Sequence, residues 1–216
     1  MSQVETDSSS LADRAYHAVR EMIVSLELRP GAVIVERDLT QQLGIGRTPM
    51  REALRRLAQE KFVAVYPRRG MFVTTVEIRD LASLCEVRVA IEGLAVRLAA
   101  ERATDSDTEE LAALSGELGS KRSPRELMEL DERVHRAIYR IARNPFLEAT
   151  AEQYYVHALR IWYLALDRAT ELGEAVQEHG GLLRAIAVGE AEEAERLVRG
   201  HVENFENAMR RVLLPL

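Results

Sequence analysis

The hydrophobic positions of this chain follow a helical period over most of its length. Apolar residues between Ser10 and Leu28 recur three and four positions apart and predict a first helix, for which Ser10 and Asp13 suit an N-terminal cap. The proline and glycine at 29–31 predict the end of that helix. The short β-branched segment 32–35 that follows favours a small strand.

Two short helices joined by a glycine turn are predicted next. The pattern places the first at 37–43, the turn at 44–46 and the second at 48–59. Each helix carries an apolar ridge that faces the other, formed by Leu39, Leu43, Ile45, Met50, Ala53, Leu54 and Leu57. Two helices that cross through such a short turn are typical of a helix-turn-helix.

A hairpin is predicted directly after these two helices. Segments 62–66 and 71–76 have the composition of strands, and the turn between them contains Arg68, Arg69 and Gly70. A hairpin that follows a helix-turn-helix is a wing, and basic residues on its tip can reach phosphates or the minor groove. An ordinary solvated turn is the alternative interpretation.

From residue 77 onward every strong hydrophobic period is helical. Ser123, Pro124 and Glu126 form the sequence signature of a capping box. The expected helices span 78–103, 106–118, 123–143, 145–168, 171–188 and 190–213. Six helices in this segment predict an all-α antiparallel bundle. The expected fold class is therefore mainly α, a winged helix-turn-helix followed by a helical bundle.

Composition adds an expected organisation in three parts. Residues 1–10 are polar and serine-rich, which predicts a disordered leader, followed by a DNA-binding domain at 11–76 and a helical domain at 77–216. The sequence has no apolar run of membrane-spanning length and no signal-peptide pattern. Its one cysteine, Cys85, suits a reducing compartment. We therefore expect a cytoplasmic protein without a membrane partner.

Charge is distributed unevenly along the chain. Residues 1–76 carry 11 basic and 9 acidic residues, whereas residues 77–216 carry 18 and 26. The net charge of −6 thus divides into +2 and −8. Because DNA repels an acidic domain, the N-terminal part is the expected contact surface.

Three arginines form a stripe at the start of the second helix of the pair. Arg47, Arg51 and Arg55 recur every four residues, and arginine matches both phosphate oxygens and the O6/N7 edge of guanine. Arginines on a helix more often lie on a solvated face, and Glu52 is placed to pair with Arg55 or Arg56. The stripe indicates DNA contact through its combination with the turn and the wing.

A second group of polar residues lies in the helical part. Asp131 and His135 are four residues apart and share one helix face, while His179 and His201 fall on the fifth and sixth helices of the bundle. Three imidazoles and a carboxylate suit a divalent transition metal, with zinc first and nickel or manganese as alternatives. Each histidine taken singly is more often an ordinary packed residue, and sequence spacing does not establish that separate helices converge.

The chain resembles a known family in both parts. The run from Ala15 to Val76, densest at RDLTQQLGIGRTPMREALRRL, resembles the winged helix-turn-helix of the GntR family of bacterial transcription regulators. The helical remainder resembles the FCD ligand-binding domain of the FadR branch, in its VanR-like six-helix subgroup. The residues that carry this second resemblance are Arg88, Glu92, Asp131, His135, Asn144, Pro145, Glu178, His179 and His201.

The resemblance implies a homodimer that binds double-stranded operator DNA and a small organic acid held at a metal. Arg37, Arg47, Thr48, Arg51 and Gly70 match the family's DNA contacts, to which the stripe and the wing tip add Arg55 and Arg69. Asp131, His135, His179 and His201 match the metal ligands of the metal-binding members. Arg88 matches an arginine that holds the effector carboxylate, and Asn204 is a further candidate on the face of His201.

Two positions depart from the family pattern. Gly46 stands where serine or threonine commonly caps the recognition helix, so it offers no side-chain oxygen. Lys61 stands where glycine is common, which is unfavourable if the backbone there is left-handed.

The sequence thus favours a regulator that acts as a repressor, rather than an enzyme. The alternatives are a metal-dependent hydrolase that uses the Asp/His site and an organic-acid-binding module. The effector, the operator, the native metal and the direction of the effector's action are not specified by these residues.

Overall fold

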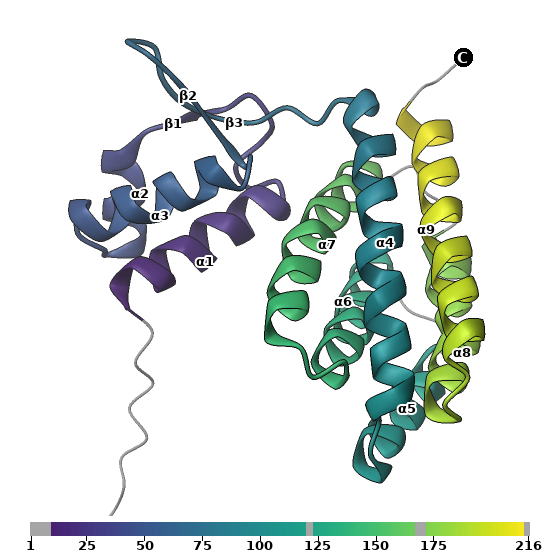
Figure 1. The fold of residues 1–216 in the computed structure, drawn as a ribbon. Coiled ribbons are helices and arrows are strands. Elements are labelled where there is room, and N and C mark those ends of the chain that lie inside the picture. The colour runs from purple at the N-terminus through teal and green to yellow at the C-terminus, as the bar shows by residue number, and fades with distance from the viewer. Residues whose placement is uncertain (1–9, 120–122, 167–171, 214–216) are drawn as a thin grey trace, which may run out of the picture. The chain divides into compact units, whose positions relative to one another are not determined.

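A computed structural model describes residues 10–119, 123–166 and 172–213. The chain divides into two compact units, Met1–Val76 and Glu77–Leu216 (Figure 1). Of the leader predicted at 1–10, residues 1–9 lie outside the described residues.

The N-terminal unit combines three helices with a small sheet. Its elements are α1 (Leu11–Val24), β1 (Val33–Ile34), α2 (Glu36–Leu43), α3 (Arg47–Gln59), β2 (Val63–Tyr66) and β3 (Gly70–Val73). The sheet is antiparallel in the order β1-β3-β2, with Val33 opposite Phe72 and Val63 opposite Val73. The helix-turn-helix and the wing predicted from the sequence are therefore both present, although the second wing strand ends at Val73 rather than Val76.

Helix α1 begins where the sequence predicts and ends earlier. Ser10 and Asp13 form a reciprocal capping box at its start. The helix was expected to reach Leu28, but it ends at Val24, and Leu26 adopts a left-handed backbone with φ +65°. The expectation was wrong because the apolar period continues into the following turn, where the Leu28 amide bonds the Met22 carbonyl.

Burial of α1 against α3 forms the core of this unit. The two helices pack together, and apolar side chains on them, together with Phe62 just after α3, are fully or almost fully buried: Ala15, Val19, Ile23, Met50, Leu54 and Leu57. Truncating one such leucine to alanine typically destabilises a protein by about 2–5 kcal/mol. This core fixes α3 so that its polar face is left exposed.

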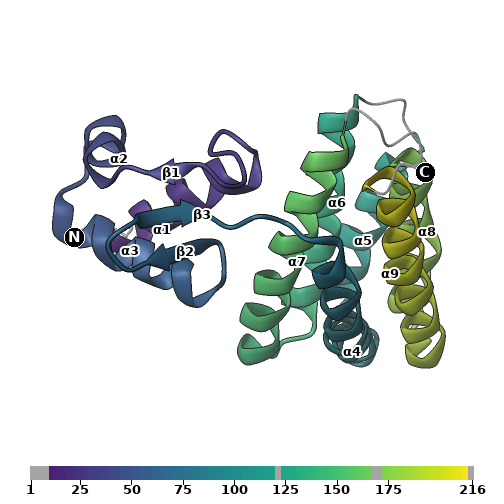
Figure 2. The ribbon, with the colours of Figure 1, turned by 90° about the horizontal axis from the view of Figure 1, so that it is seen from above.

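The C-terminal unit is a bundle of six helices in the part of the chain that is described. They are α4 (Ile78–Arg102), α5 (Asp105–Glu117), α6 (Pro124–Ile141), α7 (Pro145–Ala165), α8 (Leu172–Ala187) and α9 (Ala191–Leu213). Helix α4 packs against α6, α7, α8 and α9. The view from above shows it between α7 and α9 (Figure 2). The predicted extension of the fourth of these helices to Arg168 and the predicted start of the fifth at Glu171 reach residues outside the described part.

Local sequence explains where several of these helices begin. Ser123 and Glu126 form the predicted capping box ahead of α6, with Pro124 at the first helical position. Thr104 and Asp107 form another at α5, and Asn144 caps α7.

Cys85 on α4 is 3% exposed, and burial raises the pKa of its thiol to about 11. Within the described residues, no helix has both the length and the apolar character needed to cross a membrane.

Candidate metal centre and DNA-binding surface

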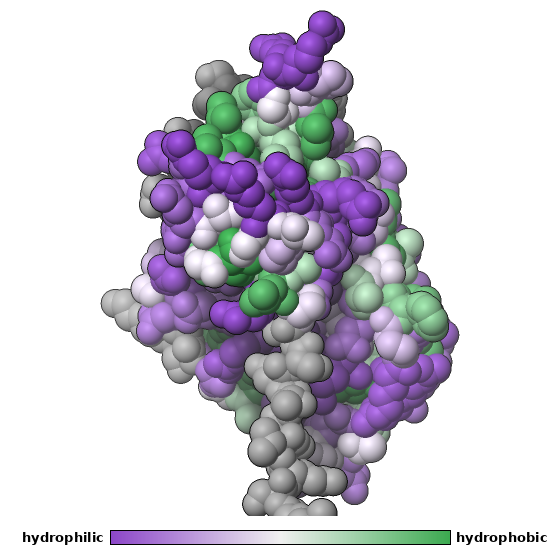
Figure 3. Space-filling view, turned by 90° about the vertical axis from the view of Figure 1, so that its left-hand side faces the viewer, coloured by the Kyte–Doolittle hydropathy of each residue, from purple (hydrophilic) through white to green (hydrophobic). Residues whose placement is uncertain are grey.

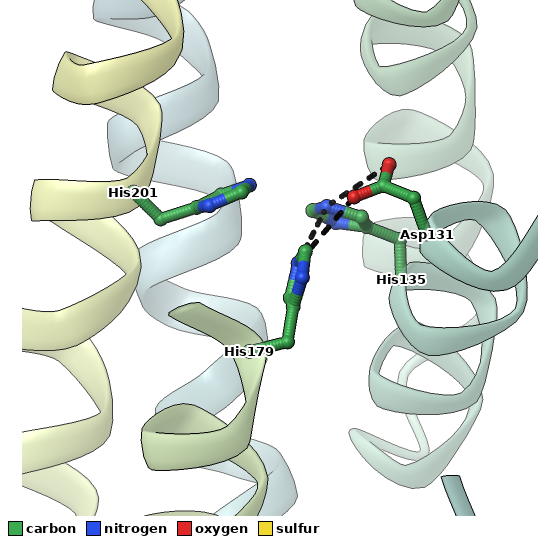
Figure 4. Close-up of side chains that lie close together, drawn as sticks. All are labelled: Asp131, His135, His179 and His201. Atoms are coloured by element: carbon green, nitrogen blue, oxygen red, sulfur yellow. Dashed lines mark hydrogen bonds and ion pairs between the residues drawn. The ribbon is translucent and has the colours of Figure 1, made fainter. Parts of the chain in front are cut away.

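Three helices bring the four candidate ligands to one place in the bundle. Asp131 and His135 come from α6, His179 from α8 and His201 from α9, and their side chains point toward one another (Figure 4). All four are buried, with exposed fractions of 4%, 1%, 1% and 7%. One potential ligand atom from each lies within 4.8 Å of all the others. The convergence that sequence spacing leaves open is thus present in the fold.

The distances among the donor atoms suit a single small cation. His135 Nε2 and His179 Nε2 are 3.3 Å apart, and the Asp131 carboxylate oxygens lie 3.9 Å and 3.7 Å from these two nitrogens. Nitrogen and oxygen ligands about 2.0–2.2 Å from one zinc ion lie roughly 3–4 Å from each other. Three of the four donors already have that spacing.

In each histidine of the cluster, the second ring nitrogen, Nδ1, lies within hydrogen-bonding distance of an oxygen atom. His179 Nδ1 is 3.1 Å from the carbonyl oxygen of Val176, and His201 Nδ1 is 3.2 Å from Glu178 Oε2. His135 Nδ1 is 3.1 Å from the hydroxyl of Tyr139. Protein ligands of metals are commonly oriented by such contacts, which fix the tautomer and direct Nε2 to the metal.

Lowered pKa values keep two of the histidines in the neutral form, which binds cations. Burial lowers the pKa of His135 well below its usual value, and His179, His201 and Arg88 lower it further. Burial also lowers the pKa of His179 to about 4, with His201 contributing. These two rings are therefore neutral at pH 7, which is the form that coordinates metal. Asp131 supplies the anionic donor, and its Oδ2 accepts a 2.8 Å hydrogen bond from the hydroxyl of Tyr155.

Arg88 and Glu92 form a buried ion pair on α4 beside this cluster. Both are 2% exposed, and Arg88 Nε donates to Glu92 Oε1 over 2.6 Å. Glu92 Oε2 lies 3.5 Å from His135 Nδ1, so the pair adjoins the candidate metal centre. Arg88 Nη1 is buried and has no hydrogen-bond partner among the described residues. A buried guanidinium nitrogen without a partner is unfavourable, which indicates a place for an anionic group.

Asn204 lies at the edge of the cluster rather than within it. Its side chain is exposed and donates a 2.7 Å hydrogen bond to Glu178 Oε1, while Glu178 Oε2 contacts His201. Burial opposes ionisation of Glu178, but the contacts with His201 and Asn204 outweigh it and lower its pKa. Asn204 is therefore connected to the cluster through Glu178.

Two tyrosines that the sequence pattern does not predict complete the site. Tyr155 stacks on His135 with ring centroids 4.4 Å apart, and Tyr139 lies four residues after His135 on the same helix. The spacing of Tyr139 is a usable signal, because residues four apart share a helix face. Tyr155 lies on another helix and has no such local signal.

The predicted DNA-contacting residues lie on the polar side of the helix-turn-helix and on the wing. All are exposed: Arg37, Arg47, Thr48, Arg51, Arg55, Arg69 and Gly70. Hydrophilic residues cover most of the face shown in Figure 3. Arg37 and Arg51 have side chains that are 75% and 69% exposed, and Arg51 pairs with Glu36. The residues are thus accessible to a nucleic acid.

The two departures from the family pattern have visible structural consequences. Gly46 occupies the N-cap of α3 in an extended conformation, and no side chain caps the helix there. Lys61 has a left-handed backbone with φ +64° just after α3. Gly44, with φ +64°, supplies the left-handed residue that the turn between α2 and α3 requires.

Comparisons with known proteins agree with both halves of this description. The profile described as "Bacterial regulatory proteins, gntR family" matches residues 11–73, and the profile described as "FCD domain" matches residues 83–204. The Nta operon transcriptional regulator of Aminobacter aminovorans is 39% identical over 138 residues, which are 60% of this chain and 62% of that protein. The regulator McbR of Escherichia coli K12 is 32% identical over 76% of this chain and 77% of its own.

A solved structure supports the same fold. The structure of E. coli McbR/YncC superposes with a TM-score of 0.81 at 24% identity and covers 95% of this chain and 100% of that one. These matches, together with the fold, identify a DNA-binding transcription regulator with a helical FCD domain, not an enzyme. The chain belongs to the GntR family, in the FadR branch that carries an FCD domain.

Proposed function

We propose that this protein is a repressor whose affinity for its operator is controlled by a small organic acid bound at a metal in the C-terminal unit. The observation that carries the proposal is the buried group of Asp131, His135, His179 and His201 beside Arg88, whose Nη1 has no hydrogen-bond partner in the part of the chain that is described. The site combines a cation-binding donor set with a buried cationic group, and such a pair suits a carboxylate ligand.

The donor set fits a divalent transition metal, with zinc preferred and nickel or manganese possible. His135, His179 and His201 would supply imidazole nitrogens, and Asp131 would supply a carboxylate oxygen. When bound, the metal would supply positive charge for an oxygen of the effector. Val176, Tyr139 and Glu178 hold the histidines in the orientation that this role needs.

Arg88 would bind the carboxylate of the effector. Its Nε is already engaged by Glu92, which leaves Nη1 for an incoming oxygen. A charge-assisted hydrogen bond in such a buried place is stronger than one in water. Because the four candidate ligands are at most 7% exposed, the effector must be small, or the helices must separate to admit it.

The connection between the two functions runs along the chain through α4. This helix begins at Ile78, a few residues after β3 of the wing, and it carries Arg88 and Glu92. Effector binding at Arg88 would therefore act on the helix that follows the DNA-binding unit. In a homodimer, a shift of α4 would change the spacing of the two recognition helices, and the affinity for two half-sites depends on that spacing. We propose that the effector changes the affinity for the operator in this way, and that the protein acts in the cytoplasm.

The metal site is tested by substitution and elemental analysis. His179→Ala and Asp131→Ala should lose zinc as measured by mass spectrometry on purified protein, whereas His157→Ala on α7 should retain it. Retention of zinc by both site variants would refute the ligand set.

The effector site is tested by a thermal-shift screen of small carboxylic acids on zinc-loaded protein. Ligands that bind the folded state raise the apparent melting temperature. Arg88→Lys keeps the charge but loses the planar fork of donors, so it should abolish the shift. A hit must also change binding to a duplex selected by the wild-type protein; a hit without that effect would leave only an organic-acid-binding module.

A further inference from the structure

The recognition helix α3 contains an arginine that is held by an acidic residue of the neighbouring helix. Glu36 is the first residue of α2, and both of its carboxylate oxygens accept from Arg51 Nε, over 3.0 Å and 2.8 Å. The Glu36 side chain is 20% exposed, whereas that of Arg51 is 69% exposed. The carboxylate therefore lies at the base of the guanidinium, which projects outward.

A carboxylate in this position is unfavourable for simple electrostatic attraction to DNA. It reduces the positive charge that the stripe presents to phosphates, and phosphate attraction supplies most of the affinity for DNA of any sequence. In the described part of the chain, neither Arg47 nor Arg55 is paired with a carboxylate. Glu36 thus restrains one arginine of the stripe selectively.

The geometry of the ion pair leaves the two terminal nitrogens of the Arg51 guanidinium available for DNA. Glu36 engages Nε, the donor nearest the side-chain stem, so the terminal nitrogens Nη1 and Nη2 remain for another partner. A guanidinium recognises guanine through two donors that meet O6 and N7 together. A long arginine side chain loses conformational freedom when it binds DNA. An ion pair that already restrains the side chain before binding reduces that loss.

We propose that Glu36 is a specificity-determining positioning residue that holds Arg51 in the orientation needed to read guanine in the major groove. The proposal rests on the proposed DNA contact of Arg51. Glu36 itself touches no base; it acts through Arg51. Its effect is therefore on discrimination between sequences, and its charge opposes binding to DNA in general.

The experiment compares the affinity of the whole chain for two DNA duplexes. One duplex is the sequence that the wild-type protein enriches from a random library, and the other is a scrambled sequence of the same composition. Fluorescence anisotropy gives the ratio of the two affinities for wild type, Glu36→Gln, Arg51→Ala and the double variant. Glu52→Gln on α3 is the matched control, because it removes one exposed acidic charge beside Arg51.

Glu36→Gln should lower the ratio of specific to scrambled affinity roughly tenfold, which is within the range for loss of one bidentate contact to a base. Its affinity for the scrambled duplex should stay constant or rise. Glu52→Gln should leave the ratio unchanged. In the Arg51→Ala background, Glu36→Gln should lower the ratio no further.

Two results would overturn the proposal while leaving the DNA-binding role intact. One is an unchanged ratio in Glu36→Gln; the other is a loss in the double variant equal to the sum of the two single losses. An unchanged ratio in Arg51→Ala would instead refute the proposed contact of Arg51, and this inference with it. Equal melting curves for wild type and Glu36→Gln serve as the folding control.

Discussion

At the scale of single residues, the candidate metal centre depends on side chains that touch the ligands rather than on the ligands alone. Tyr155 donates to Asp131 Oδ2 and stacks on His135. Burial raises the pKa of Tyr155 well above its usual value, so the phenol remains a donor at neutral pH. Its hydroxyl thereby fixes the orientation of the carboxylate.

Tyr155→Phe keeps the stacked ring and removes only this hydrogen bond. We expect zinc affinity to fall by roughly tenfold to a hundredfold, the usual effect of losing a group that orients a ligand. Competition with a chromophoric chelator measures the affinity. Tyr154→Phe, at the neighbouring position, is the control and should bind zinc as wild type does. Equal affinities for Tyr155→Phe and wild type would show that the carboxylate needs no such support.

The backbone at Lys61 provides a second residue-scale prediction. Its left-handed conformation is unfavourable for a residue with a side chain and easily adopted by glycine. Lys61→Gly should therefore stabilise the protein by roughly 1 kcal/mol in chemical denaturation. Glu60→Gly is the control, because Glu60 has φ −84° and gains nothing from glycine. A loss of stability in Lys61→Gly would indicate that the lysine side chain contributes more than the backbone strain removes.

At the scale of elements, the beginnings of the helices are encoded by a few adjacent residues. Asp107 shows this in α5, where it accepts hydrogen bonds from the amide and hydroxyl of Thr104, over 2.8 Å and 2.6 Å. It also accepts a 2.6 Å hydrogen bond from Arg143 Nη2, which joins α5 to the end of α6. The hydrogen bonds from Thr104 and the contact with Arg143 lower the pKa of Asp107 to about 2.

A lowered pKa makes the stability conferred by Asp107 dependent on pH in a definite direction. The contribution is complete above the unfolded-state pKa, about 3.9, and is lost as pH falls through the folded-state value. Asp107→Asn should destabilise the protein by about 1 kcal/mol at pH 7, the typical effect of losing a capping contact. The difference from wild type in denaturation free energy should shrink between pH 4 and pH 2. Asp105→Asn, in the same turn but exposed, is the control and should leave the stability at pH 7 close to that of wild type.

At the scale of the whole molecule, the two units divide the chemistry between them. The N-terminal unit carries +2 and the exposed arginines, whereas the C-terminal unit carries −8 and the buried cluster. The acidic unit disfavours contact with DNA, so the basic helix-turn-helix is left as the contact surface. The candidate metal centre and the proposed DNA contact surface therefore lie in different units.

Metal loading should stabilise the C-terminal unit selectively. A metal that binds only the folded state stabilises it by about 2.7 kcal/mol when its free concentration is a hundred times its dissociation constant. Hydrogen exchange followed by mass spectrometry should show slower exchange on zinc addition in α6, α8 and α9, because these helices carry the ligands. Helices α1 to α3 should exchange as before. Equal protection in both units, or protection retained in His179→Ala, would contradict this assignment.

The sequence predicted the elements of this fold well where the signal is local. Helical periods, the capping box at Ser123 and the glycine turn at Gly44 depend on residues within one or two turns of each other, and all three are present in the structure. The end of α1 was misplaced because Leu26 and Leu28 continue the apolar period into a turn. Periodicity records which residues are apolar, and a turn that packs apolar side chains can imitate a helix.

The sequence by itself determined the two-part architecture, the arginines of α3 and the residue types of the candidate metal centre. Only the tertiary structure decided that Asp131, His135, His179 and His201 converge, since 44 and 22 residues separate the three histidines in turn. It also decided that Tyr155 meets Asp131 and that Glu36 meets Arg51, because in each pair the two residues lie on different helices. The physical reason is that helix formation follows from neighbouring residues, whereas the meeting of side chains from separate helices depends on how the whole core packs.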